Sequence, residues 1–339
     1  MIRILNAEPI NYAGEARQIL RCLGEVDERA VNRSELLSRI ADYDVLIVRL
    51  KFRIDREVID TGKRLKVIAT ATTGLDHIDV DLAHQRGITV LSLQGESRFL
   101  RTIPATAEHT WALLLALVRR IPWAFQSVVE GRWNRDAFRG QELRGKRLGL
   151  VGFGRIGKQV ARYGLTFEMS VAAYDPYCRD WPRDVQRYRR LDDLLSTSDV
   201  LSIHVPLNGK TAGLIGAGEL AQLPPGALLI NTSRGVVIDE TALVNMLAQG
   251  HLAGAALDVV RDEWDEARRD QGSLLAYARG HRNLLITPHT GGATRESMER
   301  AEVFLAEKLR RWVQGHRQPD VRSAGRMSHR SSVIRRGKA

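Results

Sequence analysis

The feature that most constrains the fold of this chain is a run of three glycines, Gly152, Gly154 and Gly157, between a β-type run at 147–151 and a helix-like stretch. In such a turn the first glycine allows a sharp bend, the second lets the backbone approach a ligand, and the third lets the helix pack against the strand. A strand, a glycine-rich turn and a helix in this order begin a βαβ unit. The pattern therefore predicts a parallel α/β sheet that includes residues 147–151.

Short apolar runs recur on both sides of this turn. They lie at 2–5, 44–48, 66–70 and 88–92, and again at 170–174, 200–205, 227–231, 254–260 and 284–289. The runs are continuous rather than alternating, which is typical of strands buried on both faces. Because helix-like segments separate them, the sequence predicts the α/β class, with two Rossmann-like or flavodoxin-like domains that each hold a parallel sheet. A length of 339 residues suits two domains.

Two longer helices are also predicted. One, at 108–120, follows Pro104, carries a nearly continuous apolar face and ends in two arginines. We expect a helix this apolar to be buried between domains or between subunits. The other runs from Arg295 to Val313.

The residues after the glycine turn indicate which dinucleotide it would bind. The next strand ends at Asp175, eighteen residues beyond Gly157, where a carboxylate accepts hydrogen bonds from the adenosine ribose. Its charge would repel a 2′-phosphate, so NAD is favoured over NADP, although Arg179 is close enough to weaken that preference. The alternative, a glycine-rich turn without a ligand, is less favoured because strand, helix and acid occur together.

Three polar residues follow predicted strands in the second half: Arg234, Glu263 and His289. Parallel strands bring their carboxyl ends to one edge, where ligands bind. Arginine matches a carboxylate, and histidine can give and take a proton near neutral pH. A carboxylate beside that histidine would favour the imidazolium. The set suffices for hydride transfer to a keto acid, although each residue taken alone could be an ordinary surface side chain.

The composition, 44% apolar and 6% aromatic, is typical of a soluble α/β protein. No apolar run reaches the length needed to span a bilayer, and the first residues lack a signal-peptide pattern. Two cysteines, Cys22 and Cys178, fit a reducing compartment. We therefore expect a cytoplasmic protein without a membrane partner.

A basic, Ser/Arg/Gly-rich tail at 317–339 holds seven basic residues and one acidic residue, about half of the net charge of +11. It lacks an apolar period, so we expect it to be disordered. It also lacks aromatic residues for base stacking, so a solvated tail is favoured over a nucleic-acid-binding one.

Six segments in order resemble the D-isomer-specific 2-hydroxyacid dehydrogenases, nearest the D-3-phosphoglycerate dehydrogenase branch. They are TTGLDHID at 72–79, GFGRIG at 152–157, HVPL at 204–207, NTSRG at 231–235, AALDV at 255–259 and TPHTGG at 287–292. The resemblance runs from about residue 40 to 313. It implies a discontinuous substrate domain at 1–100 and 293–316, an NAD-binding Rossmann domain at 101–292, and an active site in the cleft between them.

The same resemblance implies roles for single residues. Arg234 would bind the substrate, His289 would be the acid/base and Glu263 its partner, while Asp258 would bind the nicotinamide carboxamide. Substrate-binding positions are Arg49, Thr73, Gly74 and Arg234. Cofactor-binding positions are Thr73, Thr106, Gly152, Gly154, Arg155, Ile156, Gly157, Asp175, Val205, Pro206, Thr211, Thr232, Asp258 and Gly291. No metal is expected.

The chain departs from its relatives after the catalytic Glu263, where Trp264 stands in place of the usual proline. The charged stretch 264–282 is longer than expected and would cover the site or an interface. No regulatory domain follows the resemblance, so allosteric control of that kind is not expected. Thr73, where phosphite dehydrogenases carry lysine, argues against phosphite.

The identity of the acid stays open. Arg49, Lys51 and Arg53 alternate after a strand, and in an extended loop they would point the same way, toward a distal phosphate or carboxylate. Solvated loop charges are an equally good interpretation. D-3-phosphoglycerate or a related anionic acid is therefore the leading substrate.

The alternatives are a glyoxylate or hydroxypyruvate reductase and a non-catalytic NAD-sensing protein. Relatives dimerise through the nucleotide domain, and the aromatic-rich segment 123–139 would suit a homodimer interface or pack within the chain.

Overall fold

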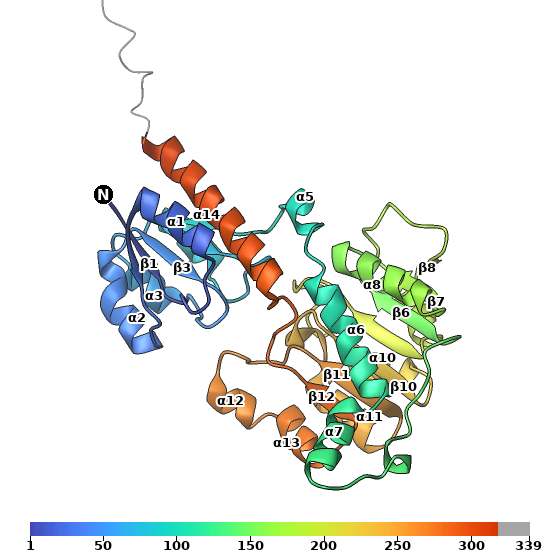
Figure 1. Ribbon diagram of the computed structural model, residues 1–339. Helices are drawn as coiled ribbons and strands as arrows, with labels where there is room; N and C mark the ends of the chain where they lie inside the picture. The colour runs from blue at the N-terminus through green and yellow to red at the C-terminus, as the bar shows by residue number, and fades with distance from the viewer. Residues whose placement is uncertain (318–339) are drawn as a thin grey trace, which may run out of the picture.

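The computed structural model describes residues 1–317 and contains two parallel β-sheets in separate units (Figure 1). The first sheet has five strands in the order β2-β1-β3-β4-β5. These are β1 (Ile2–Asn6), β2 (Gly24–Glu28), β3 (Val45–Val48), β4 (Val67–Thr70) and β5 (Thr89–Leu91). Every neighbouring pair is parallel.

The second sheet has seven strands in the order β12-β11-β10-β9-β6-β7-β8, again all parallel. The strands are β6 (Arg147–Val151), β7 (Ser170–Tyr174), β8 (Gln186–Tyr188), β9 (Val200–Ile203), β10 (Ala227–Asn231), β11 (Leu252–Leu257) and β12 (Leu284–Ile286). The two sheets confirm the predicted α/β class. The central strands β9 and β10 are buried along their whole length, as continuous apolar runs predict.

Helices connect the strands and cover the sheets. Along the first sheet these are α1 (Gly14–Leu23), α2 (Arg33–Arg39), α3 (Arg56–Thr61), α4 (Val80–Gln85) and α5 (Ser97–Leu100). The later helices are α6 (Ala105–Val118), α7 (Ile121–Val129), α8 (Arg155–Thr166), α9 (Leu191–Leu195), α10 (Ala217–Gln222), α11 (Glu240–Ala248), α12 (Glu266–Asp270), α13 (Ser273–Gly280) and α14 (Arg295–Arg317). Three short 3-10 helices are η1 (Ile40–Asp42), η2 (Asp136–Phe138) and η3 (Gly235–Val237).

The apolar helix α6 is buried, as predicted. It packs against α8 and β11, and its Trp111 and Leu114 share a core with Leu148 and Ile230 of the second sheet. The apolar face of α6 covers one face of that sheet, because a sheet buried on both sides needs a helix on each.

The last helix returns to the first unit. α14 runs along α1 in Figure 1, and its Leu305 and Leu309 pack with Leu20 and Ile4. The residues between α5 and α14 therefore form an excursion through the second sheet. The prediction that the tail begins at Arg317 is one residue early, because α14 includes Arg317; residues 318–339 lie outside the described part of the chain.

Two edge strands, β2 and β8, were not predicted from the sequence. Their residues, GEVDE and QRY, are largely polar, and each strand has a neighbour on one side only. Because an edge strand is partly solvated, its composition does not separate it from a loop.

Within residues 1–317 no single helix is long and apolar enough to cross a membrane. The segments Ser97–Val118 and Ile121–Val129 reach that length and composition only when they are counted together across a bend of 61°.

Candidate active site

Residues from both units line one cavity of about 380 Å³. Most of them lie just beyond the carboxyl ends of β1, β3, β4, β10, β11 and β12, as expected for open parallel sheets. The predicted site residues on its wall are Arg49, Thr73, Gly74, Thr106, Arg155, Ile156, Thr232, Arg234, Asp258, His289 and Gly291. Residues that are far apart in the sequence thus line one cavity.

His289 and Glu263 form a hydrogen-bonded pair. Nδ1 of His289 lies 2.8 Å from Oε1 of Glu263, and no hydrogen bond joins Nε2 to any residue in the range 1–317. Glu263 does not line the main cavity; it lines a neighbouring one of about 600 Å³, on which His289 also borders. The carboxylate therefore holds the ring from behind and leaves Nε2 for a ligand in the cavity.

Arg234 is fixed by three neighbours. Its Nε forms an ion pair with Asp76, and its Nη1 donates to the Ser233 carbonyl at 2.7 Å. Its Nη2 lies where a side chain at Gly74 would be, so the guanidinium packs directly on that glycine. Asp76 was not predicted as a site residue, although it belongs to the segment 72–79 that carried the resemblance.

Asp258 organises the loop that carries His289. Its side chain is 2% exposed, and Oδ1 accepts from the Thr287 hydroxyl at 2.7 Å and the Thr290 amide at 2.8 Å. The Gly291 amide donates to Oδ2 at 2.7 Å, and Nε2 of His109 lies 3.1 Å from Oδ1. Burial raises the pKa of Asp258, but these hydrogen bonds outweigh it and hold the pKa below its ordinary value.

These contacts bear on the predicted role of Asp258 toward the cofactor. Both of its oxygens already accept hydrogen bonds from the chain. His109, which was not predicted, reaches it from α6, one turn after the start of that helix. Its apolar helical context gave no signal that the ring faces a carboxylate.

The glycine turn fits a dinucleotide. Gly152 has φ of +94°, which favours glycine, and a side chain at Gly157 would overlap the Gly152 carbonyl. A side chain at Gly154 would meet nothing within 4 Å, so the backbone at the start of α8 is open to a phosphate. The adjoining cavity of about 760 Å³ is lined by Gly154, Arg155 and Asp175 among others.

Asp175 is less free than predicted. Its Oδ2 accepts from the Phe153 amide at 2.8 Å, and its Oδ1 accepts from the amides of Tyr177 at 2.8 Å and Cys178 at 3.0 Å. These bonds fix the turn after β7 and place the carboxylate at the cavity wall. Three other predicted cofactor residues, Val205, Pro206 and Thr211, follow β9 and line neither cavity.

The three basic residues after β3 do not converge, so that prediction is wrong. Only Arg49 lines the main cavity, and it donates to the Ile10 carbonyl at 2.9 Å. Lys51 Nζ donates instead to the Val31 carbonyl at 2.7 Å. Arg53 lines none of the cavities described here.

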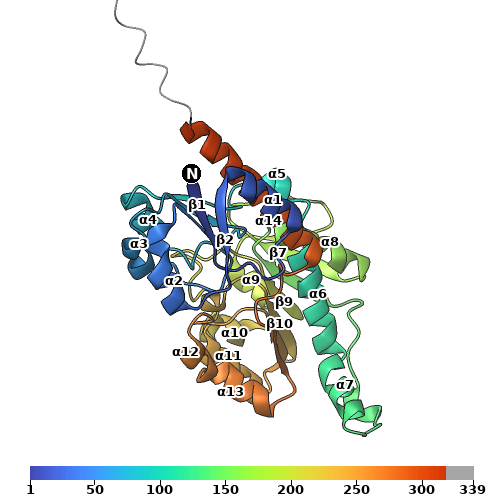
Figure 2. The ribbon, with the colours of Figure 1, turned by 60° about the vertical axis from the view of Figure 1, so that its left-hand side comes forward.

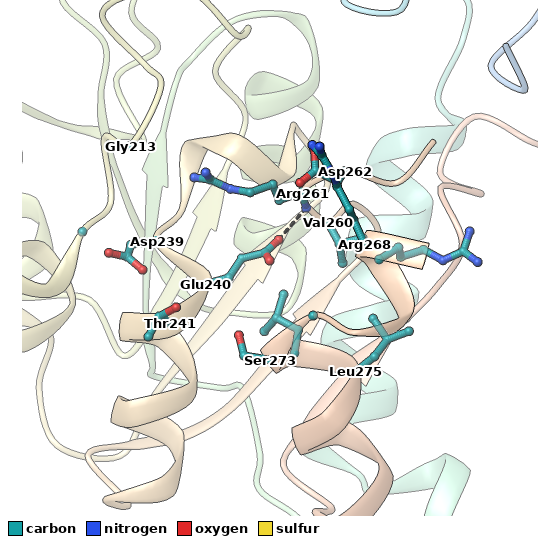
Figure 3. Close-up of a pocket in the computed structure, with 14 residues that line it drawn as sticks. Gly213, Asp239, Glu240, Thr241, Val260, Arg261, Asp262, Arg268, Ser273 and Leu275 are labelled. Atoms are coloured by element: carbon teal, nitrogen blue, oxygen red, sulfur yellow. Dashed lines mark hydrogen bonds between the residues drawn. The ribbon is translucent and has the colours of Figure 1, made fainter. Parts of the chain in front are cut away.

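The charged stretch 264–282 folds into α12 and α13 beside the His289–Glu263 pair. Its Trp264, Arg269 and Arg279 line the 600 Å³ cavity behind His289. A further cavity of about 480 Å³ is lined by Arg268 and Ser273 of the same stretch. Figure 3 shows that Glu240 of α11 accepts a hydrogen bond from the Arg261 amide at this cavity. This contact anchors the segment that leads to Glu263.

Comparison with known proteins gives the family. Residues 111–291 match the family described as D-isomer specific 2-hydroxyacid dehydrogenase, NAD binding domain. The hydroxypyruvate reductase of Thermotoga maritima is 40% identical over 287 residues, which cover 84% of this chain and 90% of that protein. The D-3-phosphoglycerate dehydrogenase of Archaeoglobus fulgidus is 37% identical over 318 residues, 93% of this chain and 58% of that protein.

The chain therefore spans little more than half the length of that phosphoglycerate dehydrogenase. A crystal structure of D-lactate dehydrogenase from Aquifex aeolicus, complexed with NAD and lactic acid, superposes with a TM-score of 0.78 at 29% identity, covering 92% of this chain and 96% of that one. These findings confirm the resemblance seen in the sequence. The chain belongs to the D-isomer specific 2-hydroxyacid dehydrogenase family, a family of oxidoreductases that use NAD, and residues 111–291 are its NAD-binding domain.

Proposed function

We propose that this protein interconverts a small D-2-hydroxy acid and its 2-keto acid by hydride transfer with NAD. The observation that carries the proposal is the 2.8 Å contact between His289 Nδ1 and Glu263 Oε1. The His289 ring lines the same cavity as Arg234. An acid/base and a carboxylate-binding cation thus face the same space.

The proposed roles follow from the geometry. Arg234 binds the substrate carboxylate and polarises the 2-carbonyl, with Thr73 and Gly74 beside it. His289 Nε2 gives a proton to the carbonyl oxygen during reduction and takes it back during oxidation, while Glu263 stabilises the imidazolium. NAD, when bound along the glycine turn, supplies or accepts the hydride. Gly154, Arg155 and Asp175 would hold it.

The domain limits belong to the same proposal. A substrate domain at 1–100 and 293–316 is supported by the packing of α14 on α1, and an NAD domain at 101–292 by the packing of α6 on the second sheet. The active site then lies in the cleft between them, which closes on substrate to exclude water.

An NADH-oxidation screen over 2-keto acids, with and without a distal phosphate, tests the function. Turnover of at least one acid that is lost in His289→Ala, with NADH binding retained, is the expected result. Tight NADH binding without turnover of any 2-keto acid would favour the NAD-sensing alternative.

We further propose a homodimer that forms through α7 and the loop after it. Figure 2 shows α7 projecting from the second unit, and its Phe125 and Val129 are 67% and 63% exposed. Trp133 in the following loop is 88% exposed. An apolar surface this open favours a subunit contact. Sedimentation of Phe125→Asp should give a monomer, whereas Ile10→Asp, at an equally exposed residue of the first unit, should leave a dimer.

A cytoplasmic location is also proposed. Cys22 and Cys178 are both free thiols, which fits a reducing compartment. Fractionation of the native host tests this location. Recovery of the protein in an oxidising compartment would contradict the cytoplasmic assignment.

A further inference from the structure

Three residues that line the main cavity, Glu8, Arg49 and Glu302, are linked by hydrogen bonds, and we call them the distal wall. Glu302 lies on α14 and is 1% exposed. Its Oε2 accepts from the Ala13 amide at 2.7 Å, and its Oε1 forms an ion pair with Arg49 Nη2. Arg49 Nη1 is taken by the Ile10 carbonyl at 2.9 Å. Both terminal nitrogens of the guanidinium therefore have a partner in the chain, whereas its buried Nε has none within the described residues.

Glu8 adds a second carboxylate to this wall. Its Oε1 accepts from the backbone amides of Arg49 at 2.8 Å and Lys51 at 3.3 Å. No cationic side chain within residues 1–317 hydrogen-bonds to it. Burial raises the pKa of both Glu8 and Glu302. When both carboxylates are ionised, an additional negative charge next to them is unfavourable.

The distal wall lines the same cavity as the reacting groups. Arg234, Gly74 and His289 line this cavity together with Glu8 and Glu302. Once the substrate carboxylate lies on Arg234, the far end of a three-carbon acid shares the cavity with two carboxylates and one already paired arginine. The same cavity is also lined by Arg155, whose Nη1 donates to the Ile103 carbonyl at 2.9 Å, and by the uncharged Leu50, Leu93 and Met298.

From this geometry we propose that the distal wall makes the enzyme select 2-keto acids with an uncharged, hydroxyl-bearing end and reject their phosphate esters. The proposal rests on the proposed function. A hydroxyl can donate to Glu8, whereas a phosphate dianion can only accept and is repelled by both carboxylates. Glu8 and Glu302 are thus specificity-determining residues. They were not predicted from the sequence, because neither follows β10, β11 or β12, the strands that precede Arg234, Glu263 and His289.

The arginines of the neighbouring cavity do not change this expectation. Arg269 and Arg279 lie behind His289, in the space bordered by Glu263, and neither lines the cavity that holds Arg234. A phosphate bound there would lie on the far side of the acid/base from the carboxylate anchor.

The test compares kcat/KM for hydroxypyruvate and 3-phosphohydroxypyruvate with NADH in the unmodified chain. We expect a preference of about 100-fold or more for the unphosphorylated acid, since like charges in an enclosed site discriminate strongly. Glu302→Gln removes the negative charge paired with Arg49 and should narrow the kcat/KM ratio at least about tenfold, mainly by lowering KM for the phosphorylated acid. Glu8→Gln should also narrow the kcat/KM ratio between the two acids, without disturbing the packing of α14. Glu299→Gln, an exposed change on the same helix, is the matched control and should leave the ratio unchanged.

A preference for the phosphorylated acid in the unmodified chain would overturn the distal-wall proposal and leave the proposed function intact. If Arg279→Ala then abolished that preference, the anion site would lie behind His289. An unchanged ratio in both Glu8→Gln and Glu302→Gln also overturns it. If neither acid nor any other 2-keto acid oxidises NADH, the proposed function itself fails.

Discussion

His289 Nδ1 lies 2.8 Å from Glu263 Oε1, and this contact joins the loop after β12 to the segment after β11. His289 itself has φ of +53°, a left-handed conformation that side chains rarely adopt. Its amide donates to the Asp258 carbonyl at 2.8 Å, which helps to hold this conformation. Because the carboxylate accepts from Nδ1, the neutral ring keeps its proton on Nδ1, and Nε2 remains available to a ligand.

The pair can be separated by substitution. Glu263→Gln keeps a hydrogen-bond acceptor but removes the charge that stabilises the imidazolium, so kcat should fall by about 10²-fold. His289→Ala removes the acid/base altogether and should cost about 10³-fold or more, with the Kd for NADH nearly unchanged. Steady-state kinetics and NADH fluorescence titration measure the two effects. Near-normal turnover in His289→Ala would contradict the assigned role.

Asp258 should prove to be a structural centre of the site. Asp258→Ala removes a buried carboxylate that accepts from Thr287, Thr290 and Gly291, and it leaves those donors unpaired. Each buried donor that is left unpaired typically costs about 1–3 kcal/mol of unfolding free energy. Asp258→Asn retains the shape and one acceptor, so its loss should be smaller. Urea unfolding checks both, and equal stability of the Ala variant and the unmodified chain would show that the network contributes little.

The sequence predicted the parts of the fold that are determined locally. β9 and β10 are short, apolar and buried on both faces, and they were found as continuous apolar runs. β2 and β8 were missed because these two edge strands carry mostly polar residues, unlike the apolar edge strands β5 and β12. The position of α6 could not be predicted, since an apolar face shows that a helix is buried but not which surface buries it.

The same division holds for the site. Arg234 and His289 were found because they follow β10 and β12, and parallel strands bring such residues to one edge. Glu302 reaches Arg49 across a sequence separation of 253 residues, and His109 reaches Asp258 across 149. No local pattern contains such contacts, because they arise only when helices dock.

The close packing of Gly74 against Arg234 gives a direct test of the carboxylate anchor. A methyl group at this position would overlap the guanidinium, so Gly74→Ala must displace Arg234. A misplacement of about 1 Å in a substrate-positioning group can lower kcat/KM about 10²-fold. We expect a loss of this order for the keto acid, while NADH binding is unaffected. Gly218→Ala in α10 is the control, since a side chain there meets nothing within 4 Å. Equal kcat/KM in the two variants would show that Arg234 is not the anchor.

His77, next to Asp76 in the same loop, should make stability depend on pH. The ring is 1% exposed, its Nε2 has no hydrogen-bond partner in the described chain, and burial lowers its pKa to about 4. The charge of Arg234 and that of His289 when protonated lower it further, whereas Asp76 opposes them.

The direction of the effect follows from proton uptake. The unfolded chain binds a proton at His77 below about pH 6.5, whereas the folded chain does so only near pH 4, so this contribution to stability is complete above pH 6.5 and is lost as the pH falls toward 4. The loss is about 1.4 kcal/mol per pH unit within that window. His77→Asn cannot titrate, and its unfolding free energy should therefore fall less steeply than that of the unmodified chain between pH 6.5 and 4.5. Urea unfolding at several pH values measures both slopes, and parallel slopes would mean that His77 is protonated in the folded protein.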